Sequence, residues 1–193
     1  MHLPELVGSS GLLVLAATNA PVKPWISRKI VHMGIGTLLL NADISDPNVV
    51  NSIYTVGSTV ALLTTAQGLK HISDGRKTDG FIKDIGIFGY VMSCCMCLLL
   101  SVPYSEITPL FYSDPAGAII GRTIDSPKIW ENKTIAGTTA VIGTTFITTH
   151  GDIPEKITVS IIVALIELFG GKIDNSLIAS FLILRYLIEN NIK

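Results

Sequence analysis

The apolar residues of this chain fall into eight blocks that short polar clusters separate. The blocks lie at about residues 5–20, 30–42, 49–69, 84–102, 107–121, 134–149, 157–170 and 176–190. This pattern predicts an all-α, polytopic transmembrane helical bundle of about eight spans. Several blocks are shorter than the ~20 residues of a straight span, but short spans are tolerated where helices line a polar cavity. No linker separates two domains, so we expect residues 1–193 to form a single integral membrane domain.

The composition agrees with this interpretation. Charged residues make up 15% of the 193 residues and the mean hydropathy is +0.53, whereas a soluble domain usually carries about 25% charged residues. The N-terminal stretch MHLPELVGSSGLLVLAATNA has no Lys or Arg before its apolar part, so we expect a retained first span rather than a signal peptide. Cys94, Cys95 and Cys97 share one apolar block, where we expect them to act as small buried hydrophobes.

The basic residues are distributed unevenly among the predicted loops. Eleven of the fourteen Lys and Arg residues lie in alternate loops at 21–29, 70–83, 122–133 and 171–175. Because positively charged loops stay in the cytoplasm, we predict that these loops are cytoplasmic and that both termini lie outside. Trp25 and Trp130 lie in the same loops, where indole rings anchor helices at the membrane interface. No basic run suits nucleic-acid binding.

Asp114 is a polar residue that the membrane pattern does not explain. An ionised Asp near mid-membrane costs about 2.5–3.5 kcal/mol on insertion scales. A regular helix would place Asp114 about 12 Å below the cytoplasmic boundary near Arg122. A structural ion pair with Arg122 is the alternative to a functional role. Gly117 and Gly121 follow on the same helical face. They either pack as a G-x-x-x-G face against another helix or let a nucleotide approach the backbone.

A second polar group opens the sixth block. In the stretch ENKTIAG, Lys133 and Thr134 stand at the start of a predicted helix and Gly137 follows one turn later. The free N–H groups at a helix N-terminus attract phosphate, and Lys and Thr add a charge and a hydroxyl. The alternative for Lys133 is an interfacial lysine that extends toward the lipid headgroups. The stretch is not a Walker A loop, because Pro127 and Asn132 occupy its glycine positions.

Two further groups lie at the start of the second block and near the C-terminus. In SRKIVHMGIG, the spacing of Arg28, Lys29 and His32 lets all three share one helical face. In ALIELFGGKIDNSLIAS, Glu167 lies inside an apolar block and Asp174 precedes the last one. Asp174 is either a helix N-cap or a ligand, whereas Glu167 has no such structural explanation.

These groups together predict a polar pocket between membrane helices that faces the cytoplasm. Its carboxylates, cations and helix N-terminus suit a metal-bound polyphosphate, since carboxylates hold Mg²⁺ and Lys and Arg hold phosphate oxygens. No Ser-His-Asp arrangement, zinc site or haem motif is recognisable in the sequence.

Four stretches appear in an order that resembles a known family. They are SRKIVHMGIG, SDPAGAIIGR, NKTIAGTTA and ALIELFGGKIDN. Together they resemble the membrane-bound CTP-dependent lipid kinases: dolichol kinase, phytol and farnesol kinase, and CTP-dependent diacylglycerol kinase. A more distant similarity reaches phosphatidate cytidylyltransferase. The resemblance runs from about Ser27 to the end of the chain. It implies phosphoryl transfer from CTP, with Mg²⁺, to the hydroxyl of a membrane lipid alcohol.

The resemblance also implies roles for single residues. Asp114 would bind Mg²⁺ or act as the base toward the lipid hydroxyl, and Asp174 would be a second metal ligand. Lys133, Arg122 and Arg28 would hold phosphates. The other positions that would bind the nucleotide are Lys29, His32, Gly117, Gly121, Thr134, Gly137 and Asn175. The chain departs from the family at Ile173-Asp174-Asn175, where the family has Asp-Asp-Asn, and at TIDSPK, where the family has an aromatic-Gly pair.

Two other functions stay open at this point. Cytidylyl transfer to a lipid phosphate would use the same pocket and release pyrophosphate instead of CDP. A transporter or a non-catalytic membrane protein would turn over no nucleotide. The expected partners are CTP, a lipid alcohol and the bilayer, without nucleic acid. The identity of the lipid and the oligomeric state, including a homodimer, are not determined by the sequence.

Overall fold

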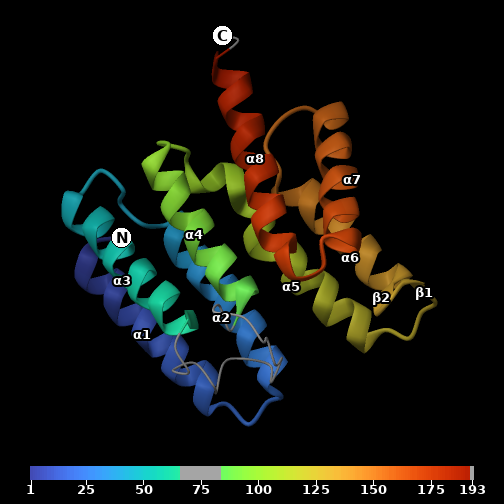
Figure 1. Cartoon of the computed structure of the whole chain (residues 1–193), viewed down its shortest axis with the longest axis horizontal. Helices are drawn as coiled ribbons and strands as arrows, with labels where there is room; N and C mark the ends of the chain where they lie inside the picture. Colours follow the sequence, from blue (N-terminus) through green and yellow to red (C-terminus); the bar gives the residue numbers. More distant parts are fainter. Residues whose placement is uncertain (66–83, 192–193) are drawn as a thin grey trace. The chain divides into compact units, whose positions relative to one another are not determined.

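The computed structural model of the chain describes residues 1–65 and 84–191. These residues divide into two compact units, Met1–Ser101 (unit 1) and Val102–Lys193 (unit 2), each formed by consecutive elements. Figure 1 shows that nearly all of the described chain is helical. The predicted all-α class is therefore confirmed.

The described part of unit 1, residues 1–65 and 84–101, contains four helices. They are α1 (Leu3–Asn19), α2 (Pro24–Leu40), α3 (Pro47–Thr65) and α4 (Ile85–Leu99). Helix α1 packs against α2, and α3 packs against α4 (Figure 1). Val49 of α3 and Cys97 of α4 are fully buried, Cys94 is buried, and all three cysteines are free thiols. Cys94 and Cys97 therefore pack as the expected small buried hydrophobes, whereas Cys95 is only half-buried.

Unit 2 contains the other four helices and the short elements between them. In chain order they are η2 (Tyr104–Ile107), α5 (Thr108–Thr123), β1 (Lys128–Trp130), β2 (Lys133–Thr134), α6 (Ile135–Thr148), α7 (Ile153–Phe169), η3 (Gly171–Ile173) and α8 (Asp174–Asn191). Ile107 at the end of η2 and Leu110 and Phe111 at the start of α5 are completely buried. Val163 and Leu182 extend this core along α7 and α8. The core therefore fixes the relative positions of α5, α7 and α8, which carry the acidic residues described below.

Helices α5 and α6 approach each other closely because glycines face each other. A Cβ on Gly137 would lie 2.9 Å from the carbonyl oxygen of Gly117 and 3.2 Å from the Cα of Gly121. Contacts this short leave no room for a side chain. The buried hydroxyls of Ser113 and Thr145 lie 2.8 Å apart across the same helix pair. Gly117 and Gly121 thus form the helix-packing face that their spacing predicts.

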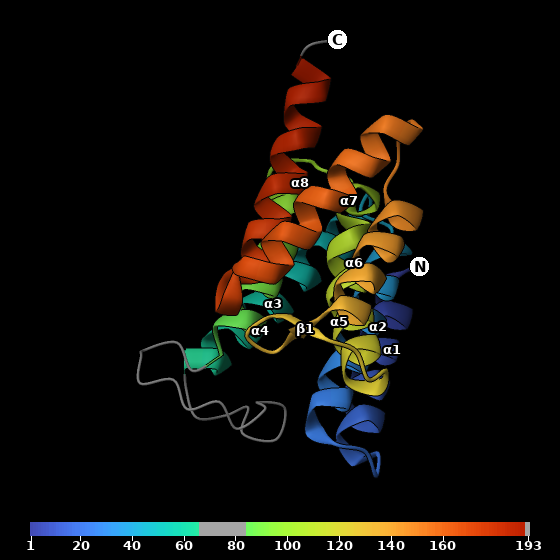
Figure 2. The same ribbon diagram turned by 90° about the vertical axis from the view of Figure 1, so that its right-hand side faces the viewer.

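A two-stranded hairpin occupies part of the predicted loop at 122–133. Strands β1 and β2 pair in antiparallel orientation, with Trp130 opposite Lys133. Figure 2 shows the hairpin between the ends of α5 and α6. Glu131 in its turn has a φ of 44°, in the left-handed region that non-glycine residues rarely occupy. The sequence did not predict this hairpin, because its strands are too short to show a period of two.

The helices match the eight apolar blocks, with differences at their ends. Helix α2 begins at Pro24, six residues before its block, because Pro is well suited to the first position of a helix. Helix α7 begins at Ile153, four residues early, because the Asp152 side chain accepts a hydrogen bond of 3.0 Å from the Glu155 amide. The apolar blocks therefore underestimate the length of a helix when its first turn lies outside the block.

The predicted membrane spans, in contrast to the predicted helices, find no support in the described part of the structure. Within residues 1–65 and 84–191, none of the helices combines the length and the apolar character of a membrane span. The basic loop at 70–83 and the end of the third block, at 66–69, lie outside the described residues. The predicted sidedness and the single domain over residues 1–193 remain predictions.

Candidate functional site

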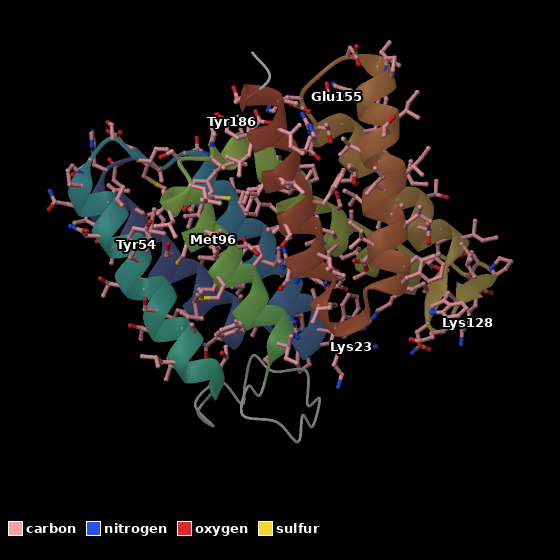
Figure 3. The ribbon with its side chains drawn as sticks, turned by 45° about the horizontal axis from the view of Figure 1, so that its top comes forward. Lys23, Tyr54, Met96, Lys128, Glu155 and Tyr186 are labelled. Atoms are coloured by element: carbon pink, nitrogen blue, oxygen red, sulfur yellow. The ribbon has the colours of Figure 1, made fainter. Side chains whose placement is uncertain are left out.

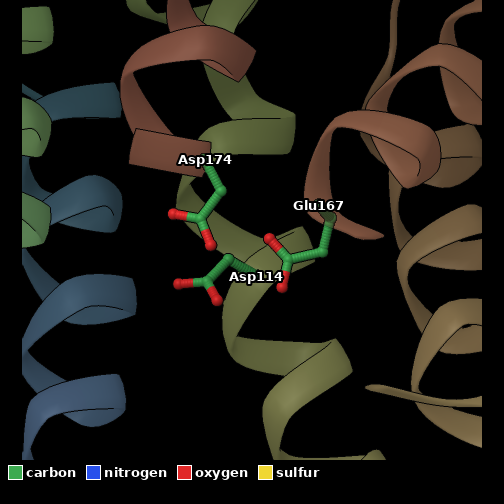
Figure 4. Close-up of side chains that lie close together, drawn as sticks. All are labelled: Asp114, Glu167 and Asp174. Atoms are coloured by element: carbon green, nitrogen blue, oxygen red, sulfur yellow. The ribbon is translucent and has the colours of Figure 1, made fainter. Parts of the chain in front are cut away.

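Three carboxylates from three different elements converge in unit 2. Asp114 lies in the middle of α5, Glu167 near the end of α7 and Asp174 at the start of α8. One carboxylate oxygen of each lies within 4.8 Å of the others. Figure 4 shows the three side chains pointing toward a common centre. We refer to Asp114, Glu167 and Asp174 as the acidic cluster.

A glycine pair between α7 and α8 brings two of these carboxylates together. A Cβ on Gly170 would lie 2.6 Å from the Ile166 carbonyl oxygen and 3.0 Å from the Cα of Asp174. Gly171 has a φ of 60°, which favours glycine. The chain therefore reverses direction within a few residues, and Asp174 returns to the end of α7 where Glu167 lies.

Burial makes the acidic cluster unusual. Asp114 is 7% exposed and Glu167 is 6% exposed. The Oε2 atom of Glu167 is buried and has no hydrogen-bond partner among the described residues, and the same is true of Oδ1 of the buried Asn175. Buried acceptors without partners cost free energy. Oxygen atoms in this arrangement are the ligands that Mg²⁺ and Ca²⁺ prefer, so the site fits a divalent cation.

Lys133 supplies a cation beside the acidic cluster. Its Nζ donates a hydrogen bond to Oε1 of Glu167 and forms an ion pair with it. Burial alone would lower the pKa of Lys133, but the charge of Glu167, the hydrogen bond to it and the charges of Asp174 and Asp114 together raise the pKa above its usual value. Lys133 is therefore an ammonium group at neutral pH. Glu167 holds it with one carboxylate oxygen while the other oxygen stays without a partner.

The N-terminus of α6 is less open to phosphate than the sequence suggested. Thr134 is the N-cap, and its Oγ1 accepts a hydrogen bond of 3.2 Å from the Gly137 amide. The Ala136 amide donates to Ser126 Oγ, and the Ile135 amide donates to the Pro127 carbonyl. A phosphate bound here would have to displace these partners, so Thr134 and Gly137 have a clear structural role at the start of α6. Their role in nucleotide binding remains a prediction.

Arg122 lies apart from the acidic cluster along α5. It is exposed in the last turn of the helix. Eight residues separate it from Asp114, which corresponds to a rise of about 12 Å. Nothing in the structure tests the expectation that Arg122 holds a phosphate.

The three candidate residues of α2 belong to unit 1. The Arg28 guanidinium donates two hydrogen bonds, of 3.0 and 3.2 Å, to the carboxylate of Asp84. Asp84 also caps α4 by accepting a bond of 3.0 Å from the Ile87 amide. Such a bidentate pair is strong and geometrically specific, so Arg28 ties α2 to the start of α4. This contact gives Arg28 a structural role within unit 1 that the sequence did not predict.

His32 and Lys29 lie on the same helix. His32 is buried, its ring centroid lies 4.1 Å from that of Tyr90, and its carbonyl oxygen accepts a hydrogen bond of 3.0 Å from the Tyr90 hydroxyl. Lys29 is half-buried. The structure therefore places His32 in the packing between α2 and α4.

The sequence placed Glu167 among the groups of the predicted polar pocket without giving it a role, and it assigned Asp84 to no site. Glu167 stood out only as an acid inside an apolar block. The available signal was the Gly-Gly pair between Glu167 and Asp174, which predicts a sharp reversal that returns the second acid toward the first. For Asp84 no signal existed, because its partner Arg28 lies 56 residues away in the chain.

Comparisons of the chain with protein-family models, with curated proteins and with solved structures gave no match. A proposal about function therefore depends on the site and on the resemblance of its motifs.

Proposed function

We propose that this chain is a membrane-embedded kinase that transfers the γ-phosphoryl group of CTP to the hydroxyl of a lipid alcohol, in the presence of Mg²⁺. The observation that carries the proposal is the convergence of the acidic cluster with Lys133. Three converging carboxylates, two of them buried, lie next to an ammonium group. They match the two needs of a metal-bound polyphosphate, namely ligands for the metal and a positive charge for phosphate oxygens.

The site residues have separate tasks in this proposal. Asp174 and Glu167 would hold Mg²⁺ with Asp114, and Asn175 would add an amide oxygen. Bound Mg²⁺ would neutralise charge on the phosphate oxygens during transfer. Lys133 would contact the transferred or the neighbouring phosphate. The choice of CTP rests on the motif resemblance alone.

The reaction breaks the bond between the γ-phosphorus and the oxygen that bridges it to the β-phosphorus. A new bond forms between that phosphorus and the lipid hydroxyl oxygen, and CDP leaves. Asp114 would take the hydroxyl proton if Asp174 and Glu167 hold the metal without it. Most of the rate enhancement would come from positioning and charge neutralisation.

The exposed surface of the helices supports a lipid environment. Large apolar side chains are exposed on several helices: Leu12 at 68%, Leu62 at 68%, Leu99 at 69% and Ile147 at 78%. Extensive apolar exposure marks a surface that contacts a membrane or another protein. The helices of 14 to 19 residues are short for a standard bilayer, and short helices are accommodated by local thinning of the lipid.

The direct test is a turnover assay with purified protein in lipid and the four nucleoside triphosphates, combined with a panel of polyprenols, phytol, farnesol and diacylglycerol. We expect CTP to be preferred and CDP to be released. Release of pyrophosphate would favour cytidylyl transfer instead. No turnover with any acceptor would favour a transporter or a non-catalytic protein.

A variant pair then tests the site itself. Asp114→Asn keeps the size of the side chain and removes its charge, so turnover per folded molecule should fall while the protein still folds. Lys133→Met removes the phosphate contact and serves as the comparison. Near wild-type turnover per folded Asp114→Asn molecule would contradict a catalytic role for this residue.

A further inference from the structure

Exposed apolar side chains gather at the hairpin and at the neighbouring helix ends, where loops in water are usually polar. Ile129 is 48% exposed, Trp130 50% and Phe169 59%. The ring centroids of Trp130 and Phe169 lie 5.4 Å apart in an edge-to-face arrangement. Two exposed lysines flank this aromatic pair, Lys128 in β1 and Lys172 in η3. We refer to these five residues as the hairpin patch.

From these positions we infer that the hairpin patch is an interfacial anchor that docks on the phospholipid headgroups of a bilayer next to the acidic cluster. This inference rests on the membrane part of the proposed function and is independent of the nucleotide. Trp is the residue most characteristic of the boundary between lipid and water, because its ring is apolar and its N–H needs a polar partner.

The charges of the hairpin patch are complementary to lipid phosphates. The ammonium groups of Lys128 and Lys172 can reach phosphates while their methylene stems cover apolar surface. Asp125 and Glu131 are also exposed nearby along the chain, so these two acids balance the two lysines and leave no excess of positive charge. The apolar side chains therefore supply most of the attraction, and the two lysines select the phosphate level of the bilayer.

The hairpin connects this surface to the acidic cluster. Trp130 of β1 pairs with Lys133 of β2, and Lys133 forms the ion pair with Glu167. Phe169, the partner of the Trp130 ring, lies two residues beyond Glu167 on α7. An anchored hairpin patch would therefore hold the cluster near the depth at which the hydroxyl of a lipid alcohol lies. Figure 3 labels Lys128 in the hairpin.

The test uses the two tryptophans of the chain. Trp25→Phe leaves Trp130 as the only indole, and Trp130→Phe leaves only Trp25, which reports on the start of α2 instead of the hairpin patch. Each protein is reconstituted in vesicles that contain phosphatidylcholine brominated either near the glycerol or near the chain end, with iodide as the aqueous quencher. We expect Trp130 to be quenched most by the shallow bromine, to be protected from iodide, and to emit at shorter wavelength than in detergent-free buffer.

A second variant tests the lysines. In the protein that carries Trp25→Phe, the additional changes Lys128→Gln and Lys172→Gln should weaken the shallow-bromine quenching and increase the quenching by iodide. The equivalent pair Lys23→Gln and Lys156→Gln, outside the hairpin patch, should change neither.

Three results would overturn the inference. Strong iodide quenching without bromine quenching would leave the hairpin patch in water. Protection from both quenchers would mean that protein covers it, either a second copy or a partner. Stronger quenching by the deep bromine would place it inside the hydrocarbon region. CTP turnover is measured on the same samples. A preparation that shows quenching by the shallow bromine but no turnover would contradict the proposed kinase activity and still support the interfacial anchor.

Discussion

Unit 2 contains two clusters that each combine three carboxylates with one cation, yet their arrangements are opposite. In the acidic cluster the carboxylates face one another, and Lys133 forms its ion pair with Glu167. In the second, which we call the arginine cluster, the cation is central. It consists of Arg185, Glu106, Glu155 and Glu189.

Arg185 contacts every carboxylate of its cluster. Its Nε lies 2.8 Å from Glu189, and its Nη2 lies 2.8 Å from Glu155 and 3.8 Å from Glu106. The guanidinium also donates a hydrogen bond of 3.2 Å to the His150 carbonyl. Because one guanidinium has five donors in a planar fork, it can hold several acceptors at once. The arginine cluster is therefore centred on its own cation, although Oε1 of Glu155, which lies 2.8 Å from Nη2 of Arg185, has no hydrogen-bond partner among the described residues.

The two clusters lie near opposite ends of the same helix pair. Eleven residues of α8 separate Asp174 from Arg185, a rise of about 16 Å. Figure 3 labels Glu155 on α7 and Tyr186, the neighbour of Arg185, at the end of these helices away from Lys128. The same composition thus produces a network closed around a cation at one end and carboxylates that face one another at the other, and the second arrangement is the one suited to binding a cation.

The largest expected effect concerns catalysis. Glu167→Gln keeps the shape of the side chain but removes a charge from the metal ligands, so it should reduce transition-state stabilisation by several kcal/mol, a loss of turnover on the order of a hundredfold or more. The matched control is Glu155→Gln on the same helix. Its turnover per folded molecule should stay close to that of the wild type. Equal losses in the two variants would remove the functional distinction between the clusters.

The next effect concerns stability. Arg185→Met leaves three carboxylates around an apolar side chain, and breaking a buried ion pair costs about 3–5 kcal/mol. Glu155 and Glu189 are partly exposed, at 32% and 41% of their side chains, so solvent reduces this cost and we expect about 3 kcal/mol, the lower end of the range.

The comparison for Arg185→Met is Lys133→Met, measured by urea unfolding in the same detergent. Lys133 contacts Glu167 at the edge of the acidic cluster, and its removal should lower the free energy of unfolding less than Arg185→Met does. A larger loss for Lys133→Met would mean that the acidic cluster depends on its lysine as a structural cation.

The third effect is the response to metal. A ligand that binds only the folded state at a hundred times its Kd stabilises that state by about 2.7 kcal/mol. We expect Mg²⁺ to raise the melting temperature of the wild type and of Glu155→Gln, and to have no such effect on Asp174→Asn. A shift that survives Asp174→Asn would place the cation elsewhere.

The sequence predicted the helices well and the contacts between distant residues poorly. Each helix coincides with an apolar block, because the clustering of apolar residues can be recognised in a short stretch of sequence without knowledge of the rest of the chain. The structure also brings Asp114 and Asp174 together, as their pattern suggested, while their role as metal ligands remains a prediction. The hairpin was missed because strands of three and two residues are too short to give a periodic signal.

The contacts that sequence reasoning could not supply depend on the path of the whole chain. Glu167 joins the acidic cluster only because the reversal at Gly170–Gly171 returns Asp174 to α7. Arg185 lies inside the last apolar block, and its three partners come from η2, α7 and α8. No local pattern distinguishes a residue that will find such partners from one that will remain free to bind a ligand.

The smallest expected effect completes the comparison between the two clusters. Glu189 is the most exposed carboxylate of the arginine cluster, and its bond to Arg185 is an i, i+4 pair on α8. Pairs of this kind contribute about 0.3–0.5 kcal/mol, because water screens the charges and the long side chains lose freedom. Glu189→Gln should therefore lower the free energy of unfolding by about that amount and leave turnover and the Mg²⁺ response unchanged. The measurement is urea unfolding beside Glu155→Gln, whose carboxylate contacts the same guanidinium from α7 and should have the larger effect. If Glu189→Gln were as damaging as Arg185→Met, the arginine would depend on this one partner, and the arginine cluster would be a single ion pair instead of the closed network that distinguishes it from the acidic cluster.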